Sequence, residues 1–510
     1  MANTAFKTYA QEHGGRVSLL LLLFLLALYE FYTVGLSAFS IICLSPAIIL
    51  IVISSFRYRM LFFWVLQFVN YLIQWKEFPS LGMPKSLPNE LLEITLLALA
   101  IIDVNNNYFK RATNIMLFTL LVWASFCTLQ VLNDTCDIGL NISAWYTGAR
   151  MMAFQLIYAF LVYSIYISNS KYLVQYLFVW GGFALFASFW VWKQKYIGFT
   201  NIENSWIQGP GYSTHIIYGG SLIRYFSVFS DAANFGIGIA STSVAFFIFG
   251  IASRIRKHKV YFFIVGIACA WAIFPSGTRT AIVCLIAGFM AYIFLSKSLK
   301  IAIPFTLIFG LFVFMLVFTN IGNGNQQIRR MRSAFDKNDA SANLRAVNQT
   351  AIKKYLQEAP WGIGIAQGYG SVPANNKYNF LSNIAADSEY VYIWIRTGVI
   401  GITIFLICTA IMFLGACWIV FFTLKSSSLR GIGAGFCCAF VSQQLGGYGN
   451  QVLMQFPNCL IFYGGLSVVY ILPYIEQEWI EYENQYLAKK EEKKRLKLEK
   501  KKKSRVETVF

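Results

Sequence analysis

The sequence predicts an all-α polytopic membrane protein, with about fourteen transmembrane helices and a large extracytoplasmic loop that contains short helices. Two observations support this fold class. Of the 510 residues, 57% are hydrophobic and only 13% are charged, whereas soluble domains carry about 25% charged residues. Apolar runs such as 17–36, 113–131 and 301–319 are also long enough to cross about 30 Å of hydrocarbon at 1.5 Å per residue.

The order of apolar runs and basic loops predicts the topology. The runs lie near residues 17–36, 37–55, 59–75, 90–108, 112–131, 150–168, 171–193, 229–252, 260–275, 279–296, 299–319, 389–422, 431–447 and 451–474. With a cytoplasmic N-terminus and an even number of helices, all the short basic connections face the cytoplasm, as the positive-inside rule requires. These connections include Arg57 and Arg59, Lys110 and Arg111, and the stretch 254–259. Both termini are therefore expected to be cytoplasmic.

The net charge of +19 is concentrated near the C-terminus. We expect residues 1–474 to form the membrane domain and 475–510 to form a basic cytoplasmic tail. Residues 489–505 hold eleven Lys or Arg, and each is worth about 1 kcal/mol near anionic lipid. We interpret the tail as a topology anchor. A tail that binds a lipid surface or nucleic acid is the alternative, but we expect no nucleic-acid partner.

Three longer loops, 132–149, 194–228 and 320–388, are expected on the outer side. The last one holds eight Lys or Arg against four Asp or Glu, and this excess of positive charge favours an anionic ligand. Within it, Leu344, Val347 and Ala351 recur at helical spacing, whereas Arg345 and Gln349 fall on the opposite face. We expect a helix that lies over the membrane with its cationic face toward solvent. The Gly-rich run 362–370 that follows is expected to be a flexible or close-packed turn.

Four stretches carry candidate functional residues. Arg224 precedes an Asp231/Asn234 turn that opens a helix, and Arg279 follows Pro275-Ser-Gly-Thr at a helix mouth. Asn343-Leu-Arg345 is followed by Ala359-Pro-Trp-Gly-Ile-Gly364, and this leads to the segment 386–401. In this order, these stretches resemble the O-antigen polymerase and ligase superfamily, which includes capsule and exopolysaccharide polymerases.

The superfamily's signature is a His, then Asn, Ser or Gln, nine arbitrary residues, Gly, two more residues, and Gly, Thr or Tyr. Ser388, Gly398 and Gly401 fit this signature, but Asp387 stands where the histidine belongs. Two explanations are open: Asp387 does the work of the histidine, or His215 is recruited from another loop. We favour Asp387, because it occupies the motif position.

The resemblance implies a glycosyltransferase in the bacterial inner membrane, with its active site on the extracytoplasmic face. The expected donor is an oligosaccharide on polyprenyl pyrophosphate, and the acceptor is a glycan hydroxyl. Departing pyrophosphate needs fixed positive charge in a water-poor site, and arginine matches phosphate oxygens with its fork of donors. The predicted catalytic residues are Asp387, Arg279 and Arg345. The predicted substrate-binding residues are Arg224, Ser388, Arg396, Asp231, Asn234 and His215. No metal ion or cofactor is expected.

Simpler roles remain open for these residues. Asp387 and Ser388 are good N-cap residues, and Glu389 in the first turn would complement the helix dipole. Arg224 and Arg279 could serve as interfacial anchors, and Arg345, like the cluster Arg329–Arg332, could be solvated.

At the level of function, a repeat-unit polymerase is the leading interpretation. A ligase that transfers the glycan to a lipid-A core or a protein is the alternative. A transporter of lipid-linked sugars is a rival of another class, and it would predict broken helices and internal repeats. Expected partners are the lipid-linked donor, the glycan acceptor, membrane lipid, a flippase and a chain-length regulator.

Overall fold

The computed structural model describes most of the chain, and the described residues are mainly helical. The described residues are 15, 18, 22, 25, 29, 58–78, 84–102, 108–217, 222–296, 303, 304, 307, 310, 311, 314, 315, 318–332, 340–384 and 388–507. The chain divides into two compact units, Met1–Trp64 and Val65–Phe510. All of the site described below belongs to the second unit.

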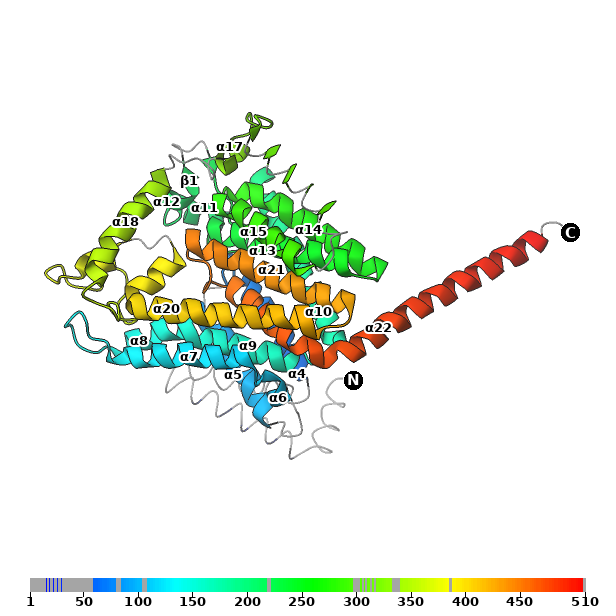
Figure 1. Ribbon diagram of the computed structural model, residues 1–510, viewed down its shortest axis with the longest axis horizontal. Coiled ribbons are helices and arrows are strands. Elements are labelled where there is room, and N and C mark those ends of the chain that lie inside the picture. The colour runs from blue at the N-terminus through cyan, green and yellow to red at the C-terminus, as the bar shows by residue number, and fades with distance from the viewer. Residues whose placement is uncertain are drawn as a thin grey trace. The chain divides into compact units, whose positions relative to one another are not determined.

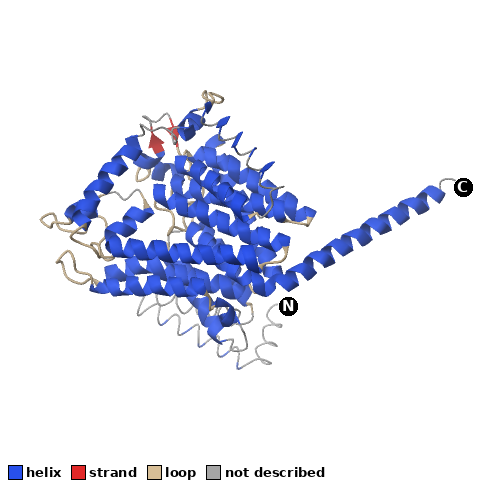
Figure 2. Cartoon of the chain, viewed as in Figure 1, coloured by secondary structure: helices blue, strands red, loops and turns tan. Residues whose placement is uncertain are grey.

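Helices account for most of the described part of the chain (Figures 1 and 2). The first group comprises α4 (Arg59–Leu72), α5 (Leu87–Ile102), α6 (Tyr108–Ala112), α7 (Ile115–Leu129), α8 (Ile142–Ala149), α9 (Gln155–Tyr166), α10 (Ser170–Tyr196), α11 (Asn201–Gln208) and α12 (Tyr212–His215). The second group comprises α13 (Ala232–Ala252), α14 (Arg256–Ser276), α15 (Arg279–Leu295), α17 (Gln326–Arg332), α18 (Ala340–Leu356), α19 (Asn379–Asn383), α20 (Glu389–Trp418), α21 (Ser427–Gly449) and α22 (Asn458–Glu507). Short 3₁₀ or π segments follow α7, α8 and α20, at Gln130–Leu132, Arg150–Phe154 and Ile419–Thr423.

A two-stranded antiparallel sheet interrupts the helices before α13. Strand β1 (Ile216–Ile217) pairs with β2 (Leu222–Ile223), with Ile216 opposite Ile223. This hairpin carries the chain from α12 to Arg224.

Seven helical segments among the described residues are long and apolar enough to cross a membrane. They are Ile115–Leu132, Ile142–Tyr166, Ser170–Tyr196, Ala232–Ala252, Arg256–Ser276, Glu389–Thr423 and Asn458–Lys490, and α15 is a shorter apolar helix. The all-α polytopic prediction is therefore confirmed. The predicted runs 17–36, 37–55 and 299–319 lie largely outside the described residues, so the count of fourteen stays a prediction. Each of the other predicted runs contains a helix.

Helix α13 forms the centre of the packing. It contacts α14, α15 and α21, and almost all of its residues are buried. Small residues permit this close packing, as is usual between helices in membranes. At Gly435 of α21, for example, an added Cβ would overlap the ring of Phe249. The N-terminal end of α13 is thereby held beside the ends of α14, α15 and α21, where the candidate site lies.

Helix α20 is broken at Gly398, which has φ +67° and ψ −168°. The Gly-rich segment fills the break: the N–H groups of Ile363 and Gly364 donate to the carbonyls of Ile395 and Arg396, both at 3.0 Å. The N–H of Ile400 in turn donates to the carbonyl of Pro360 at 3.2 Å. Backbone groups freed by a break must find such partners in a membrane protein. The prediction of a close-packed turn is confirmed here.

The last of the three loops predicted to be extracytoplasmic contacts both of the others. Asn133 donates to the carbonyl of Trp361 at 2.9 Å, and Lys195 donates to Gln327 at 3.1 Å. In Figure 1, α12 and α18 accordingly lie at the same ends of the long helices. The loops thus share one end of the helical unit.

The predicted orientation of the helix in the last loop is wrong. Val347, expected on the buried face of α18, is 65% exposed, whereas Arg345 is partly buried. The physical reason is a polar anchor, since Arg345 Nη2 donates to the carbonyl of Gly449 at 3.0 Å. Ile352 and Leu356 of α18 are buried; Leu356 belongs to the predicted apolar face, whereas Ile352 does not.

Candidate functional site

Four arginines from separate segments gather where α13, α14, α15 and α21 meet. Arg224 follows strand β2, Arg279 is the first residue of α15, Arg330 lies in α17 and Arg345 lies in α18. All four are partly buried. We call these residues the arginine cluster. The tertiary structure thus brings together three arginines that the sequence singled out and adds a fourth.

The turn between α14 and α15 is the centre of the cluster. Gly277 ends α14 in the left-handed conformation, with φ +59°, which glycine adopts at little cost. Arg330 Nε donates to the carbonyl of Gly277 at 2.6 Å, and Arg224 Nη2 donates to Thr278 Oγ1 at 3.1 Å. Thr278 Oγ1 donates to the carbonyl of Ala232 at 2.7 Å. This hydrogen bond ties the turn to the start of α13.

Arg345 reaches the same turn from the opposite side, through the end of α21. Its guanidinium donates to the carbonyl of Gly449, which suits a cation at a helix C-terminus. Gly449 packs directly on Thr280, because an added Cβ would lie 2.6 Å from Thr280 Oγ1. Asn450 Nδ2 also donates to Thr280 Oγ1 at 3.2 Å. Arg345 and Arg279 therefore approach the N-terminal turn of α15 together.

The electrostatics of the cluster favour an anion. The pKa of Arg224 falls to about 10, chiefly because the side chain is buried and further because Arg330 and Arg279 are positively charged, while Asp231 acts in the opposite direction. A phosphate or pyrophosphate placed here would offset both the burial and the mutual repulsion. The cluster therefore carries an excess of positive charge in a partly buried position.

Arg330 was missed by the sequence interpretation, which placed Arg329, Arg330 and Arg332 together in a solvated cluster. Arg329 is exposed, as expected. Arg330 instead contacts Gly277, and Arg332 bonds the backbone carbonyl of Ile321. The available signal was Met331, which is fully buried and fixes which side of this short helix faces the protein.

Ser388 and Glu389 are both engaged with the chain around the end of α21. Ser388 is the N-cap of α20 but makes no side-chain capping bond; its hydroxyl donates to the carbonyl of Gly447 at 3.1 Å. Ser388 is thus the N-cap residue, as one of the simpler interpretations expected, but its hydroxyl bonds the end of α21 and not the first turn of α20. The buried Glu389 carboxylate accepts from the N–H of Leu453 at 3.0 Å. Both residues lock the start of α20 onto α21 and the loop that follows it.

A small pocket connects this segment with the arginine cluster. Its lining includes Arg345, Gln349 and Ser388. Ser388 thus lies beside one of the predicted catalytic arginines. Asp387, the predicted base, is outside the described residues, and its role stays a prediction.

His215 is buried, and both of its ring nitrogens are in polar contact. Nδ1 lies 3.1 Å from the carbonyl of Gly211 and 2.7 Å from Thr214 Oγ1, and Nε2 accepts from the N–H of Ala232 at 3.1 Å. The pKa of His215 falls to about 4, because of burial first and the Arg224 charge second. These contacts describe a neutral imidazole that caps α13.

Asp231 and Asn234 organise the start of α13. Asp231 Oδ1 caps the helix by accepting from the N–H groups of Ala233 and Asn234, at 2.8 and 3.0 Å. The fully buried Asn234 accepts from Asn458 at 2.6 Å. Their contacts position the backbone that Thr278 and His215 bind.

Arg396 belongs to a different environment. Its guanidinium carbon lies 5.1 Å from the centre of the Tyr392 ring, and its backbone carbonyl takes part in the break of α20. Neither of these contacts involves a residue of the arginine cluster.

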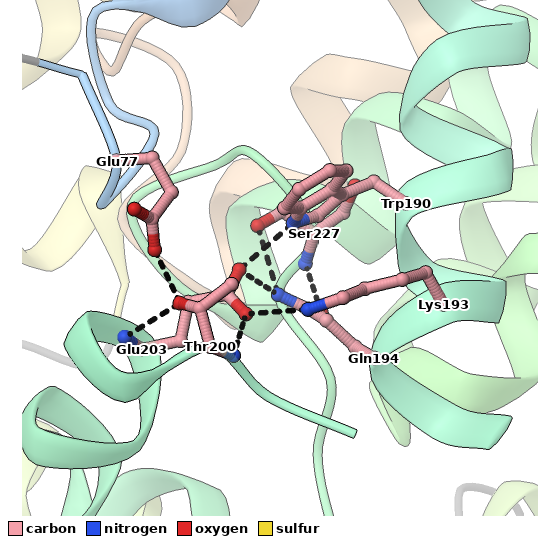
Figure 3. A network of polar contacts seen from close by, with 7 residues as sticks. All are labelled: Glu77, Trp190, Lys193, Gln194, Thr200, Glu203 and Ser227. Atoms are coloured by element: carbon pink, nitrogen blue, oxygen red, sulfur yellow. Dashed lines mark hydrogen bonds and ion pairs between the residues drawn. The ribbon is translucent and has the colours of Figure 1, made fainter. Parts of the chain in front are cut away.

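A buried acid holds the loop that presents Arg224 (Figure 3). Glu203 is fully buried and accepts from Trp190 Nε1 at 2.8 Å and from Gln194 Nε2 at 2.7 Å. Gln194 also bonds both backbone polar groups of Ser227, at 2.9 and 3.2 Å. The segment between α10 and α13 is therefore fixed to α10 by side-chain hydrogen bonds.

Lys76 is a further cation near this loop that the sequence interpretation did not single out. Its Nζ donates to the carbonyl of Ser230 at 2.9 Å and lies 3.8 Å from the centre of the Trp206 ring. Burial and the nearby Lys85 lower the pKa of Lys76 to about 8.

The fold and the site together define a polytopic helical membrane protein with a cationic site at one end of its helices. Residues 262–406 match the family model described as O-antigen ligase. The match contains three of the four clustered arginines as well as the segment 386–401. It confirms the resemblance to the O-antigen ligase and polymerase superfamily. A search of curated proteins finds no match.

Proposed function

We propose that this protein is a membrane glycosyltransferase that polymerises oligosaccharide repeat units carried on polyprenyl pyrophosphate into a surface polysaccharide. The single observation that carries the proposal is the grouping of four arginines at the start of α15: Arg224 and Arg330 bond the turn that precedes Arg279, and Arg345 bonds Gly449, which packs on Thr280. Three of them lie within the segment that matches the O-antigen ligase family.

The chemistry requires fixed positive charge more than a proton donor. A hydroxyl oxygen of the acceptor attacks the anomeric carbon of the donor, and the bond from that carbon to the pyrophosphate oxygen breaks. Negative charge develops on the leaving pyrophosphate, where preorganised guanidinium groups stabilise it. The acceptor's proton passes to a base, and we assign this role to Asp387. His215 is a poor candidate, because its nitrogens are already engaged.

The ligase alternative shares the donor chemistry and differs in the acceptor. The description of the matching family favours this alternative, and residue types in the cluster do not discriminate between the two reactions.

The transporter alternative draws on the broken helix α20. In transporters, unwound backbone groups bind the transported solute or ion. Here the groups at the break bond the segment Pro360–Gly364 instead, so the break is filled by the chain itself. We therefore retain the transferase.

Deleting the gene and separating the cell's surface glycans on a gel tests the proposal. A polymerase predicts that long chains collapse to single repeat units, whereas a ligase predicts that glycan disappears from its anchor. An unchanged glycan pattern contradicts both transferase readings.

Complementation with variants then tests the site. Asp387→Asn is expected to abolish elongation, and Arg279→Lys and Arg345→Lys are expected to impair it, with the protein still inserted in the membrane. Asp137→Asn and Arg329→Lys, at exposed positions, are matched controls that should restore normal chains. If Asp387→Asn produces chains of normal length, Asp387 has no part in the mechanism. If both Lys variants give normal product, Arg279 and Arg345 serve only to anchor the protein at the membrane interface.

A further inference from the structure

A second cationic pocket lies at the opposite end of α14 from the arginine cluster. It measures about 740 Å³, and its lining includes Arg256, Lys257, Lys489 and Lys490. Two basic stretches that are more than two hundred residues apart in the sequence therefore converge on one cavity. The volume falls in the range of about 300–1,000 Å³ that is typical of ligand sites.

Side-chain contacts hold the helices that line the pocket in place. Tyr261, on its lining, donates to the carbonyl of Phe178 at 2.8 Å. His258, in the first turn of α14, stacks on Tyr482 of α22, with ring centres 6.4 Å apart. These contacts hold the start of α14 and the middle of α22 at a defined separation.

The buried acid Glu483 of α22 is paired with residues outside the pocket. Glu483 accepts from Ser428 at 2.8 Å and lies 4.0 Å from Arg254. No acidic side chain is among the residues that line the cavity in the described part of the chain. The four basic side chains therefore present an excess of positive charge to the cavity.

The rest of the lining is apolar, and it continues along an exposed apolar stripe of α14. Val260 and Ile264 line it and are 51% and 53% exposed, and Ile267 and Trp271 continue the same face at 60% and 38%. A ligand that fits both parts carries a phosphate at one end and a hydrocarbon chain at the other. This combination is the chemistry of an anionic phospholipid.

We propose that this pocket binds one anionic phospholipid, with the phosphate among the four basic side chains and an acyl chain along α14. Helix α14 has 21 residues, so its two ends lie about 31 Å apart at 1.5 Å per residue. The lipid site is therefore separate from the arginine cluster and does not depend on the proposed transferase function.

Native mass spectrometry of the purified full-length protein tests this inference. The probes are phosphatidylglycerol and phosphatidylcholine with identical acyl chains. The expected result is a discrete phosphatidylglycerol adduct at low lipid concentration, with phosphatidylcholine at least about tenfold weaker. Equal binding of the two lipids would overturn the inference, because ordinary annular lipid would then explain the pocket.

Two variants and a matched control separate the pocket from the general charge of the tail. Replacing Arg256, Lys257, Lys489 and Lys490 with Ala is expected to weaken phosphatidylglycerol at least about tenfold. Replacing Lys500, Lys501, Lys502 and Lys503 with Ala removes the same number of charges, all from the C-terminal tail, and should leave the adduct intact. Ile264→Trp, which fills the apolar part without changing charge, should also weaken the adduct. Equal losses in the two charge variants, or no loss with Ile264→Trp, would contradict the proposed site.

Discussion

Arg330→Ala is the sharpest test of the arginine cluster, because the neighbouring Arg329 offers a control with the same change of charge. The substitution removes the hydrogen bond to the carbonyl of Gly277, and a hydrogen bond from a charged group contributes about 1.5–3 kcal/mol. It also removes a positive charge that lowers the pKa of Arg224, and this relief offsets part of the loss. We therefore expect the free energy of unfolding to fall by no more than about 2 kcal/mol.

The effect on turnover should be much larger than the effect on stability. Removing one preorganised donor from a site of developing negative charge typically lowers kcat by about 10²–10³. The assay is chain elongation by purified protein in liposomes with a lipid-linked donor, and thermal unfolding is measured on the same samples. Arg329→Ala, at an exposed position, should leave kcat within about twofold. If the two variants elongate chains equally well, Arg330 does not act on the substrate and the reasoning from its position fails.

Three further predictions concern the framework and the topology. Gly398→Ala should lower the free energy of unfolding by more than about 3 kcal/mol, because φ is +67° and a Cβ would overlap the carbonyl oxygen of Pro360. Val399→Ala, at the exposed neighbouring position, is the control. Equal thermal stability of the two variants would contradict the close packing. The pKa of His215 is lower in the folded protein than its ordinary value of about 6.5. Between pH 6.5 and 4 the unfolded chain therefore binds more protons than the folded protein. The free energy of unfolding should decrease by up to about 3 kcal/mol as the pH falls through this window. His215→Gln should flatten that part of the pH profile, and an unchanged slope would mean that another group titrates. Lys353→Cys, at an exposed position in α18, should react with a membrane-impermeant maleimide added to intact cells, whereas Lys489→Cys should not; the opposite pattern would invert the predicted topology.

Periodicity and composition predicted the helices well, because a helix that crosses hydrocarbon must satisfy its own backbone and present apolar side chains over its whole length. The runs 171–193, 229–252 and 279–296 coincide with α10, α13 and α15 within a few residues. The break of α20 was harder to foresee. Gly398 was recognised only as a signature residue, and its function as a point of close approach became visible once Pro360–Gly364 was seen to pair with it.

The candidate site, too, could be predicted only in part from the sequence. Arg224, Arg279 and Arg345 could be selected from the sequence, because each stands near a predicted helix mouth or on a loop helix. Arg330 could not, because three arginines in a stretch of four residues are equivalent until a fold buries one side of them. The roles of His215 and Ser388 likewise depended on partners distant in the chain, Ala232 and Gly447.

The sequence by itself determined that this chain is a polytopic helical membrane protein and which kinds of charge its longest loop would carry, since both follow from residue type and local spacing. Only the tertiary structure decided which arginines lie close together, which face of α18 is buried and which polar side chains hold helices together. The physical reason is that guanidinium groups repel one another, and no local sequence pattern indicates which of them lie close together in the fold. Their convergence is imposed by the packing of α13 against α14, α15 and α21.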